Sequence, residues 1–399
     1  GLAEMMNSYG VIHNDPEVVS KIVASQAHHK KIDGHAPGLQ GKDLDTYVAA
    51  GVYSDHECAT LEDALAKLQR GQFIMIREGT AARNLEALVP LLTPQYAERC
   101  MFCTDDKHPS DLLEKGHIDY IIKKAIAAGV DPIIAVKAAC HHASRYFLLN
   151  NRGAIAPGYL ADFAVIDNFK DFNVEMVFKK GVLYWNNGEL RDFDAPQIEE
   201  YLDKRAHDTF HVATLTPDDF RDTRQRGVLG MVPGEIVTTD AGYADKIDLE
   251  NDILKIAVIE RHKNTHHIGI GYIKGYGLKS GAVATSISHD SHNIIVVGAN
   301  EEDMAAAINR VVELGGGIVV LDHGEVLGEV RLQIAGIMSE EPLVDVNREL
   351  ENAKEKAFAL GVSRGVDPFM TLSFMALPVI PTLRLTTRGV FDTVTQKYV

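Results

Sequence analysis

The feature that most limits the possible folds of this chain is an alternation of short apolar runs with amphipathic stretches over residues 1–150. The apolar runs have the length of β-strands, and the stretches between them have the apolar spacing of helices. Such alternation predicts parallel strands joined by crossover helices. We count about four strand–helix units after an opening strand, which suits the second half of a (β/α)8 barrel, although a doubly wound sheet fits the same pattern.

Local signals give the bounds of the individual elements. Asp15-Pro16 combines an N-cap residue with a proline at the first helical position, and it predicts a helix through Lys30. The same reasoning predicts helices near Lys42–Ala50, at Leu61–Gln69 and between Asp111 and Leu149, and strands at Gly51–His56, Phe73–Glu78 and Arg99–Thr104.

A different pattern begins at about residue 151, so we expect three domains, at 1–150, 151–204 and 205–399. The middle segment is predicted to be a small β unit, with a strand at Ala161–Asp167 and a hairpin of Val174–Phe178 and Val182–Trp185. The last segment is predicted to be an α/β domain with strands at Ile253–Arg261, His267–Tyr272, Ala282–Ser286, Ile294–Val297 and Ile318–Leu321.

Charge and composition exclude some classes of partner. The formal net charge of −16 argues against binding to nucleic acid or to an anionic membrane. We find neither an apolar run of membrane-spanning length nor a signal peptide, and the four cysteines have neither a disulfide-framework nor a zinc-finger spacing. These features predict a cytoplasmic protein.

Potential metal ligands follow successive apolar runs. Glu4, His35, His56, Glu78 and Asp105 each stand where a predicted strand ends. In a parallel barrel the carboxyl ends of the strands meet at one face, where catalytic groups lie. A single such histidine is usually structural, and a single aspartate often caps the next helix. Together they favour a site for a divalent metal, since imidazole and carboxylate are its usual ligands.

Several long segments of the chain resemble the adenine deaminase family of the amidohydrolase superfamily. They are GLAEMMN (1–7), GHAPGLQGKDLDTYVAAGVYSDHEC (34–58), MIREGTAARNL (75–85), CTDDKHPSDLLEKGHIDYII (103–122), GAIAPGYLADFAVID (153–167), SHDSHNIIVVGANEEDM (288–304) and DPFMTLSFMALPVIPTLRLTTRGVFD (367–392). The similarity runs nearly end to end and its motifs are uncommon, whereas GxIxPGxxAD alone would indicate only the superfamily.

The resemblance implies a metal-dependent (β/α)8 barrel, present here from about the fourth to the eighth strand, flanked by β-sandwich strands. It implies that Glu4 bridges two metal ions, and that His35 and His56 are the ligands of the fifth and sixth strands. Asp105 would be the ligand of the eighth strand and the proton shuttle. The implied metal is Mn²⁺ or Fe²⁺, ahead of Zn²⁺.

The implied reaction is the hydrolysis of adenine to hypoxanthine and ammonia by a metal-activated hydroxide, in purine salvage. Adenine is the expected partner, in a homo-oligomer that binds neither nucleic acid nor membrane. Arg77 and Glu78 would meet the purine edge or form a salt-bridged pair at the barrel rim. Asp106 would orient the shuttle, contact the substrate or cap the next helix.

One part of the family pattern is missing. The first barrel strand of the family ends in a His-x-His pair, whereas the chain has only adjacent pairs at His28-His29, His141-His142 and His266-His267. The sequence opens without Met in what would be the fourth strand. We therefore expect an N-terminal truncation, with the pair upstream, and little deaminase activity from the isolated 399-residue chain.

Two alternative functions fit parts of the sequence. Another cyclic amide or amidine hydrolase of the same fold, such as a dihydroorotase or a guanine deaminase, would share the strand-end ligands but not the segments at 288–304 and 367–392. A catalytically incomplete purine-binding fragment would fit the missing His-x-His. His289, Asp290 and His292 would be a polar turn, or would face the active site or a second site.

Overall fold

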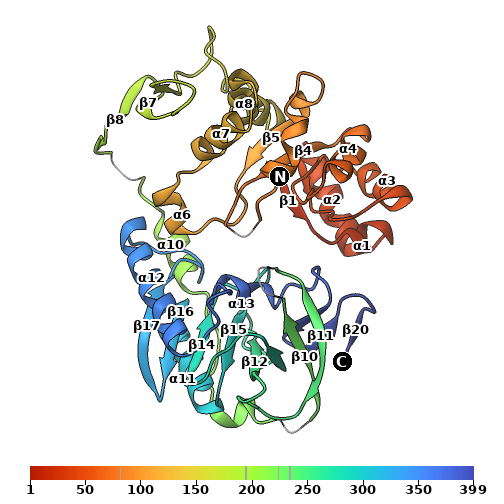
Figure 1. The fold of residues 1–399 in the computed structure, drawn as a ribbon, viewed down its shortest axis with the longest axis vertical. Coiled ribbons are helices and arrows are strands. Elements are labelled where there is room, and N and C mark those ends of the chain that lie inside the picture. Colours follow the sequence, from red (N-terminus) through yellow and green to blue (C-terminus); the bar gives the residue numbers. More distant parts are fainter. Residues whose placement is uncertain (81, 194–195, 223, 233–234) are drawn as a thin grey trace. The chain divides into compact units, whose positions relative to one another are not determined.

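The computed structural model describes residues 1–80, 82–193, 196–222, 224–232 and 235–399. The chain forms two compact units, Gly1–Ala195 and Pro196–Val399 (Figure 1).

The strands of the first unit are β1 (Leu2–Met5), β2 (Ile32–Gly34), β3 (Ser54–Asp55), β4 (Phe73–Arg77), β5 (Cys100–Cys103), β6 (Phe163–Ile166), β7 (Val174–Lys179), β8 (Val182–Asn186) and β9 (Glu189–Leu190). Its helices are α1 (Ser8–Ile12), α2 (Pro16–Ala27), α3 (Gly41–Ala49), α4 (Leu61–Gln69), α5 (Leu85–Leu88), α6 (Pro109–Glu114), α7 (Ile118–Ala127), α8 (Pro132–Ala139) and α9 (His141–Tyr146), with short 3-10 helices η1 (Val89–Leu91) and η2 (Ala97–Arg99).

The predicted parallel strands with helical connections are confirmed in the first unit. β1 pairs in parallel with β2, and β3, β4 and β5 form a second parallel sheet. The Tyr53 N–H donates to the carbonyl of Ile32 at 2.9 Å, which joins the two sheets. At least one helix lies between each of the strands β1 to β5 and the next strand along the chain. The carboxyl end of each of these five strands therefore opens into a loop that precedes a helix.

Side-chain caps explain where several helices begin. The Asp15 carboxylate accepts hydrogen bonds from the N–H groups of Glu17 and Val18 at the start of α2. Asp131 does the same for α8, and the Thr60 hydroxyl caps α4, whose bounds match the prediction. Predicted ends are less accurate, because α2 stops at Ala27 and not at Lys30.

Two of the differences in element length have local causes. His29 has a φ of 52°, and this left-handed residue ends α2 and leaves both His28 and His29 outside the helix. β3 stops at Asp55 and does not continue to His56. The reason is that the Asp55 carboxylate accepts the N–H of Glu57 at 3.1 Å, a turn that interrupts strand pairing.

The segment after α9 forms a four-stranded antiparallel sheet in the order β6-β7-β8-β9. The predicted hairpin of β7 and β8 is confirmed. Lys180 and Gly181 at its turn have φ values of 51° and 76°. Positive φ at both central residues is the geometry of a two-residue type I′ turn, which matches the twist of the flanking strands.

The second unit is built on an eight-stranded sheet in the order β11-β10-β13-β12-β15-β14-β16-β17, with a separate three-stranded sheet β18-β19-β20. Its strands are β10 (Arg226–Met231), β11 (Thr238–Ala244), β12 (Ile253–Ile259), β13 (Ile268–Lys274), β14 (Ala282–Thr285), β15 (Ile294–Gly298), β16 (Gly317–Asp322), β17 (Glu325–Arg331), β18 (Leu383–Thr386), β19 (Gly389–Asp392) and β20 (Lys397–Tyr398). Its helices are α10 (Glu200–His207), α11 (Glu301–Glu313), α12 (Leu343–Ala359) and α13 (Met370–Phe374), with the 3-10 helix η3 (Pro217–Phe220).

The large sheet of the second unit separates two hydrophobic cores. Leu254, Ile256 and Val258 of β12 belong to the core that also includes residues of α12 and α13. Ala257 and Ile259 of the same strand belong to the core that includes residues of α11. This period of two is the side-chain alternation of a strand covered on both faces. The α/β character predicted for this region is confirmed, including the five strands β12 to β16.

Every helix in the described ranges is too short or too polar to cross a membrane.

Candidate metal centre

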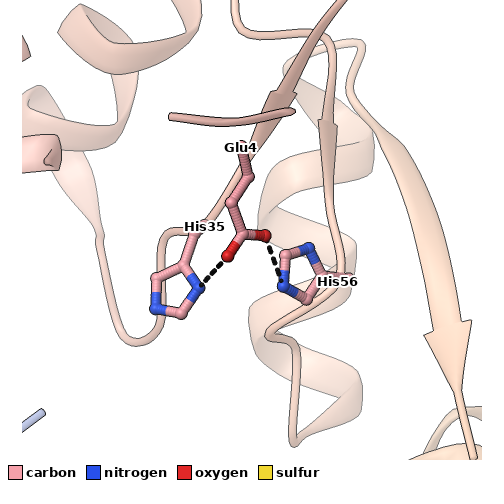
Figure 2. A group of neighbouring side chains, drawn as sticks. All are labelled: Glu4, His35 and His56. Carbon is pink, nitrogen blue, oxygen red and sulfur yellow. Dashed lines mark ion pairs between the residues drawn. The ribbon is translucent and has the colours of Figure 1, made fainter. Parts of the chain in front are cut away.

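Glu4, His35 and His56 lie together in the first unit. Glu4 is in β1, His35 directly follows β2, and His56 directly follows β3. The two carboxylate oxygens of Glu4 point to different rings, Oε2 to His56 Nε2 at 2.8 Å and Oε1 to His35 Nδ1 at 3.4 Å (Figure 2). The three ligand atoms lie within 4.8 Å of one another, a spacing suited to a metal ion.

Glu57 and Asp105 extend this group. His56, Glu57 and Asp105 form a second set of three ligand atoms within 4.8 Å. Glu57 Oε1 is also 3.5 Å from His35 Nδ1 and 3.4 Å from His56 Nε2, so Glu57 links the two sets. We did not single out Glu57 from the sequence. The only signal was its position directly after His56 in SDHEC, because Glu57 lies in the loop beyond the strand.

Arg77, at the end of β4, is bound to two carboxylates of this cluster. Its guanidinium donates from Nη1 and Nη2 to Glu57, the Nη2 contact being 2.9 Å, and from Nη1 to Asp105 Oδ2 at 2.6 Å. Arg77 Nε donates to Asn84 Oδ1 at 2.8 Å, and the side chain is buried. Arg77 therefore fixes the carboxylates of Glu57 and Asp105 relative to each other.

Arg77 and Glu78 do not form the salt-bridged pair that was one of the two alternatives from the sequence, because Arg77 bonds Glu57 and Asp105 whereas Glu78 bonds Lys124. Glu78 is buried, and its Oε1 accepts from Lys124 Nζ of α7 at 2.6 Å. Asp106 follows Asp105 in the loop after β5, where its N–H donates to Asp105 Oδ1 at 3.0 Å. Asp106 is not the cap of the next helix, because the N-cap residue of α6 is His108.

Glu4 and His56 form an ion pair within this cluster. Burial by itself would raise the pKa of Glu4, but its contacts with His35 and His56 outweigh burial and lower that pKa to about 2. Burial would likewise lower the pKa of His56. The hydrogen bond to Glu4 and the negative charges of Glu4, Glu57 and Asp105 outweigh burial and raise that pKa to about 9. Glu4 is therefore a carboxylate at neutral pH, and His56 is held by negative charge that would equally attract a cation.

The donor set fits a divalent metal. Three carboxylates, those of Glu4, Glu57 and Asp105, face one guanidinium, that of Arg77. Within the described residues His35 Nδ1 is a buried polar atom that lacks a regular hydrogen bond, although it points at two carboxylates. A metal ion between these groups would satisfy that nitrogen and neutralise the surplus charge.

Tyr47 of α3 ties the strand of Glu4 to that of His35. Its buried hydroxyl donates to the carbonyl of Met5 at 2.5 Å and accepts from the N–H of His35 at 3.0 Å. Burial is the main cause that raises the pKa of Tyr47 well above its usual value, so the hydroxyl stays protonated. The backbones that carry Glu4 and His35 are thus held by one side chain.

Gly34 precedes His35 at a point of close contact. A Cβ atom there would lie 2.3 Å from the carbonyl oxygen of Ser54 and 2.7 Å from Val52 Cγ1. We expect Gly34→Ala to lower the free energy of unfolding by about 1–3 kcal/mol, because overpacking moves the backbone of β2 away from β3. Chemical denaturation measures this, with Gly365→Ala, where the only contact is Ser363 Oγ at 3.9 Å, as the control. Equal stability of the two variants would contradict the tight packing.

His289, Asp290 and His292 lie in the second unit, in the loop between β14 and β15. His289 Nδ1 is 3.5 Å from Asp290 Oδ1, and the His289 ring stacks on Phe374 with centroids 4.7 Å apart. Buried Arg261 donates from Nε to the carbonyl of His292. These contacts fit the polar turn among the alternatives for this loop. Its side chains do not contribute to any of the possible metal-ligand groups among the described residues.

Comparison with known proteins gives the family. Residues 2–184 match the amidohydrolase family, and residues 235–397 match the adenine deaminase C-terminal domain. An adenine deaminase of Desulfatibacillum aliphaticivorans is 45% identical over 406 residues, covering 98% of this chain and 70% of that protein. Adenine deaminase 2 of Carboxydothermus hydrogenoformans is 42% identical (98% and 70% covered), and an adenine deaminase of Kosmotoga olearia is 43% identical (100% and 70% covered).

The chain belongs to the adenine deaminase family. The resemblance read from the sequence is thereby confirmed. The amidohydrolase match falls within the first unit and the C-terminal-domain match within the second. Amidohydrolases generally use a divalent metal, which agrees with the donor set around Glu4.

Proposed function

We propose that the protein is an enzyme that hydrolyses adenine to hypoxanthine and ammonia. In this reaction the bond between C6 and the exocyclic nitrogen breaks and a bond between C6 and a water oxygen forms. The observation that carries the proposal is the group of Glu4, His35 and His56 at successive strand ends, in a chain 45% identical to a curated adenine deaminase. We place the reaction in purine salvage in the cytoplasm, with the enzyme as a homo-oligomer.

The proposed metal ligands are Glu4, His35, His56 and Asp105. The two oxygens of Glu4 face different histidines, which suits a carboxylate shared between two divalent ions. Glu57 is a further donor within reach of both histidines. Carboxylate-rich sites with imidazole suit Mn²⁺ or Fe²⁺ as well as Zn²⁺, and we put Mn²⁺ and Fe²⁺ first.

Two divalent cations, when bound, lower the pKa of water enough to supply hydroxide near neutral pH. The residues of the chain supply the rest of the chemistry. Asp105 Oδ1 and Oδ2 are the proposed acceptors of the proton released by water, and Asp105 returns it to the ring nitrogen or to the departing amine. Arg77 holds Oδ2 at 2.6 Å, so the carboxylate keeps one orientation during this transfer.

The purine is proposed to bind beside Asp105, with Arg77, Glu78 and Asp106 around it. Arg77 acts by fixing Asp105 and Glu57, since its guanidinium is engaged by both. Glu78, the residue after Arg77, is held by Lys124 of α7. Asp106 donates its N–H to Asp105, and we assign its carboxylate to orientation of the shuttle or of the substrate.

We also propose the finer architecture that the sequence suggests. The strands β1 to β5 are the second half of a (β/α)8 barrel, within residues 1–150. The sheet β6-β7-β8-β9 contributes to a β-sandwich within 151–204, and 205–399 is the C-terminal α/β domain. Parallel pairing of β1 with β2 and of β3 with β4 and β5 supports the barrel.

The proposed function is tested by substrate comparison in the full-length gene product loaded with Mn²⁺. We expect ammonia and hypoxanthine from adenine, with loss of activity on chelation and two metal equivalents per chain. A larger kcat/KM for guanine or dihydroorotate would favour another amidohydrolase reaction. Adenine binding without turnover and without metal would favour a purine-binding module.

A further inference from the structure

A fully buried ion pair lies next to the candidate metal centre, beginning at the residue that precedes His56. Asp55, the last residue of β3, and Lys67 of α4 are both inaccessible to solvent, and Lys67 Nζ is 2.9 Å from Asp55 Oδ2. Lys67 Nζ also donates to Asp63 Oδ2 at 2.9 Å, and Cys58 Sγ contacts Asp55 at 3.2 Å. Neither Asp55 nor Lys67 touches Glu4 in any of the contacts observed.

The contacts of this pair converge on the two loops that carry the histidines. Asp55 Oδ1 accepts the N–H of Ala36, the residue after His35, at 2.8 Å. Lys67 Nζ donates to the carbonyl of the same residue, Ala36, at 2.8 Å. Asp55 Oδ2 accepts the N–H of Glu57, the residue after His56, at 3.1 Å. One buried pair therefore fixes the backbone on the carboxyl side of both histidines.

Burial of this pair is difficult to explain by stability alone. Desolvation of two charges offsets much of their attraction, and apolar replacement of buried ion pairs is often neutral or stabilising. Apolar side chains, however, could not bond the backbone of Ala36 or of Glu57. The distinctive contribution of the pair is thus directional, since it sets where the two loops stand relative to each other.

We propose that Asp55 and Lys67 are positioning residues that set the relative placement of His35 and His56 for metal binding. The inference rests on the proposed function, because it takes those histidines as ligands. The two residues act through the backbone and not on the substrate. Groups that orient metal ligands from outside typically contribute 10–100-fold to metal affinity.

The test measures the Kd for Mn²⁺ and the melting temperature of the metal-free full-length gene product. The main variant is Asp55→Leu with Lys67→Met, which removes both charges of the pair together and leaves Asp63, whose side chain is 12% exposed, without its lysine partner. We expect a folded variant with an Mn²⁺ affinity weakened about 10–100-fold. Its melting temperature should fall, because the N–H groups of Ala36 and Glu57 lose their acceptor. Loss of the free Mn²⁺ electron paramagnetic resonance signal reports binding without reference to activity.

A second variant guards against failure of the double variant to fold. Asp55→Asn keeps an oxygen for Ala36 and leaves Lys67 paired with Asp63, but it removes the charge that binds Lys67 and the acceptor for Glu57. We expect weakened Mn²⁺ affinity here as well. The control is Arg70→Met, which breaks an exposed pair with Asp45 at the end of the same helix and should leave the affinity unchanged.

The outcomes separate the inference from the function on which it rests. Wild-type affinity in a folded Asp55→Asn or double variant would overturn the positioning role while leaving the metal site intact. A wild-type protein that binds no Mn²⁺ would contradict the metal site itself, and the positioning role with it. Weakened binding in both variants, with the Arg70→Met control unchanged, would support the proposal.

Discussion

Asp105→Asn is expected to lower kcat for adenine by at least about 10²–10⁴-fold, the usual contribution of a positioned general acid–base group. An amide cannot accept and return the proton, and the variant also removes a negative charge from the metal site. Asparagine is a conservative replacement here because Asp105 has a φ of 55°, a conformation that asparagine tolerates. Steady-state kinetics and metal analysis of the active enzyme measure both effects.

Asp106→Asn is the matched control for that variant. Its backbone N–H bond to Asp105 does not depend on its own side chain and should persist. We expect a smaller loss of kcat, or a higher KM, with unchanged metal content. If Asp106→Asn lost metal while Asp105→Asn kept it, the ligand and the shuttle would have to be reassigned to Asp106, and the family assignment would stand.

Glu4→Gln is expected to abolish tight metal binding and, with it, deamination. The two oxygens of Glu4 face different histidines. Glutamine replaces one of these oxygens by an NH2 group that cannot bind a metal, and it removes the negative charge of the shared carboxylate. Changes to groups outside the ligand shell already cost about 10–100-fold in affinity, so a loss beyond about 100-fold is expected for a shared ligand. Metal analysis after dialysis, together with ammonia release, measures the outcome.

The control for Glu4→Gln is Glu86→Gln, a change at an exposed residue in the first turn of α5. It should leave metal content and turnover at wild-type levels. The melting temperature of metal-free Glu4→Gln should remain high enough for the comparison, because Glu4 lies partly at the surface. Retention of two metal equivalents by Glu4→Gln would show that other residues hold the ions.

Sequence periodicity was sufficient to predict the strand ends at which Glu4, His35 and His56 lie. His35 and His56 could be placed at the ends of short strand-like segments, 31–34 and 51–55, and parallel strands bring their carboxyl ends to one side. The position of Glu4 followed in the same way. These predictions depend on the short-range spacing of apolar and polar residues. Each strand and each connecting helix of a parallel sheet shows such spacing in its own segment.

The roles of Lys67 and Glu57 could not be predicted from sequence periodicity. Lys67 reads as an ordinary solvent-facing lysine of an amphipathic helix, although it lies three residues after buried Ala64 on the inner face of α4. Its burial depends on Asp55, a residue that is distant in sequence and becomes a partner only after folding. Glu57 was missed for a related reason, since a loop carboxylate shows no periodicity and its role comes from Arg77.

The most direct test of the account is anomalous X-ray diffraction from crystals of the full-length gene product soaked in Mn²⁺. The account predicts manganese peaks within bonding distance, about 2.0–2.3 Å, of Glu4, His35 Nδ1 and His56 Nε2. Asp105 should contact one of the ions. Manganese found only elsewhere, with the ion pair between Glu4 and His56 intact, would contradict the assignment of this cluster as the metal centre.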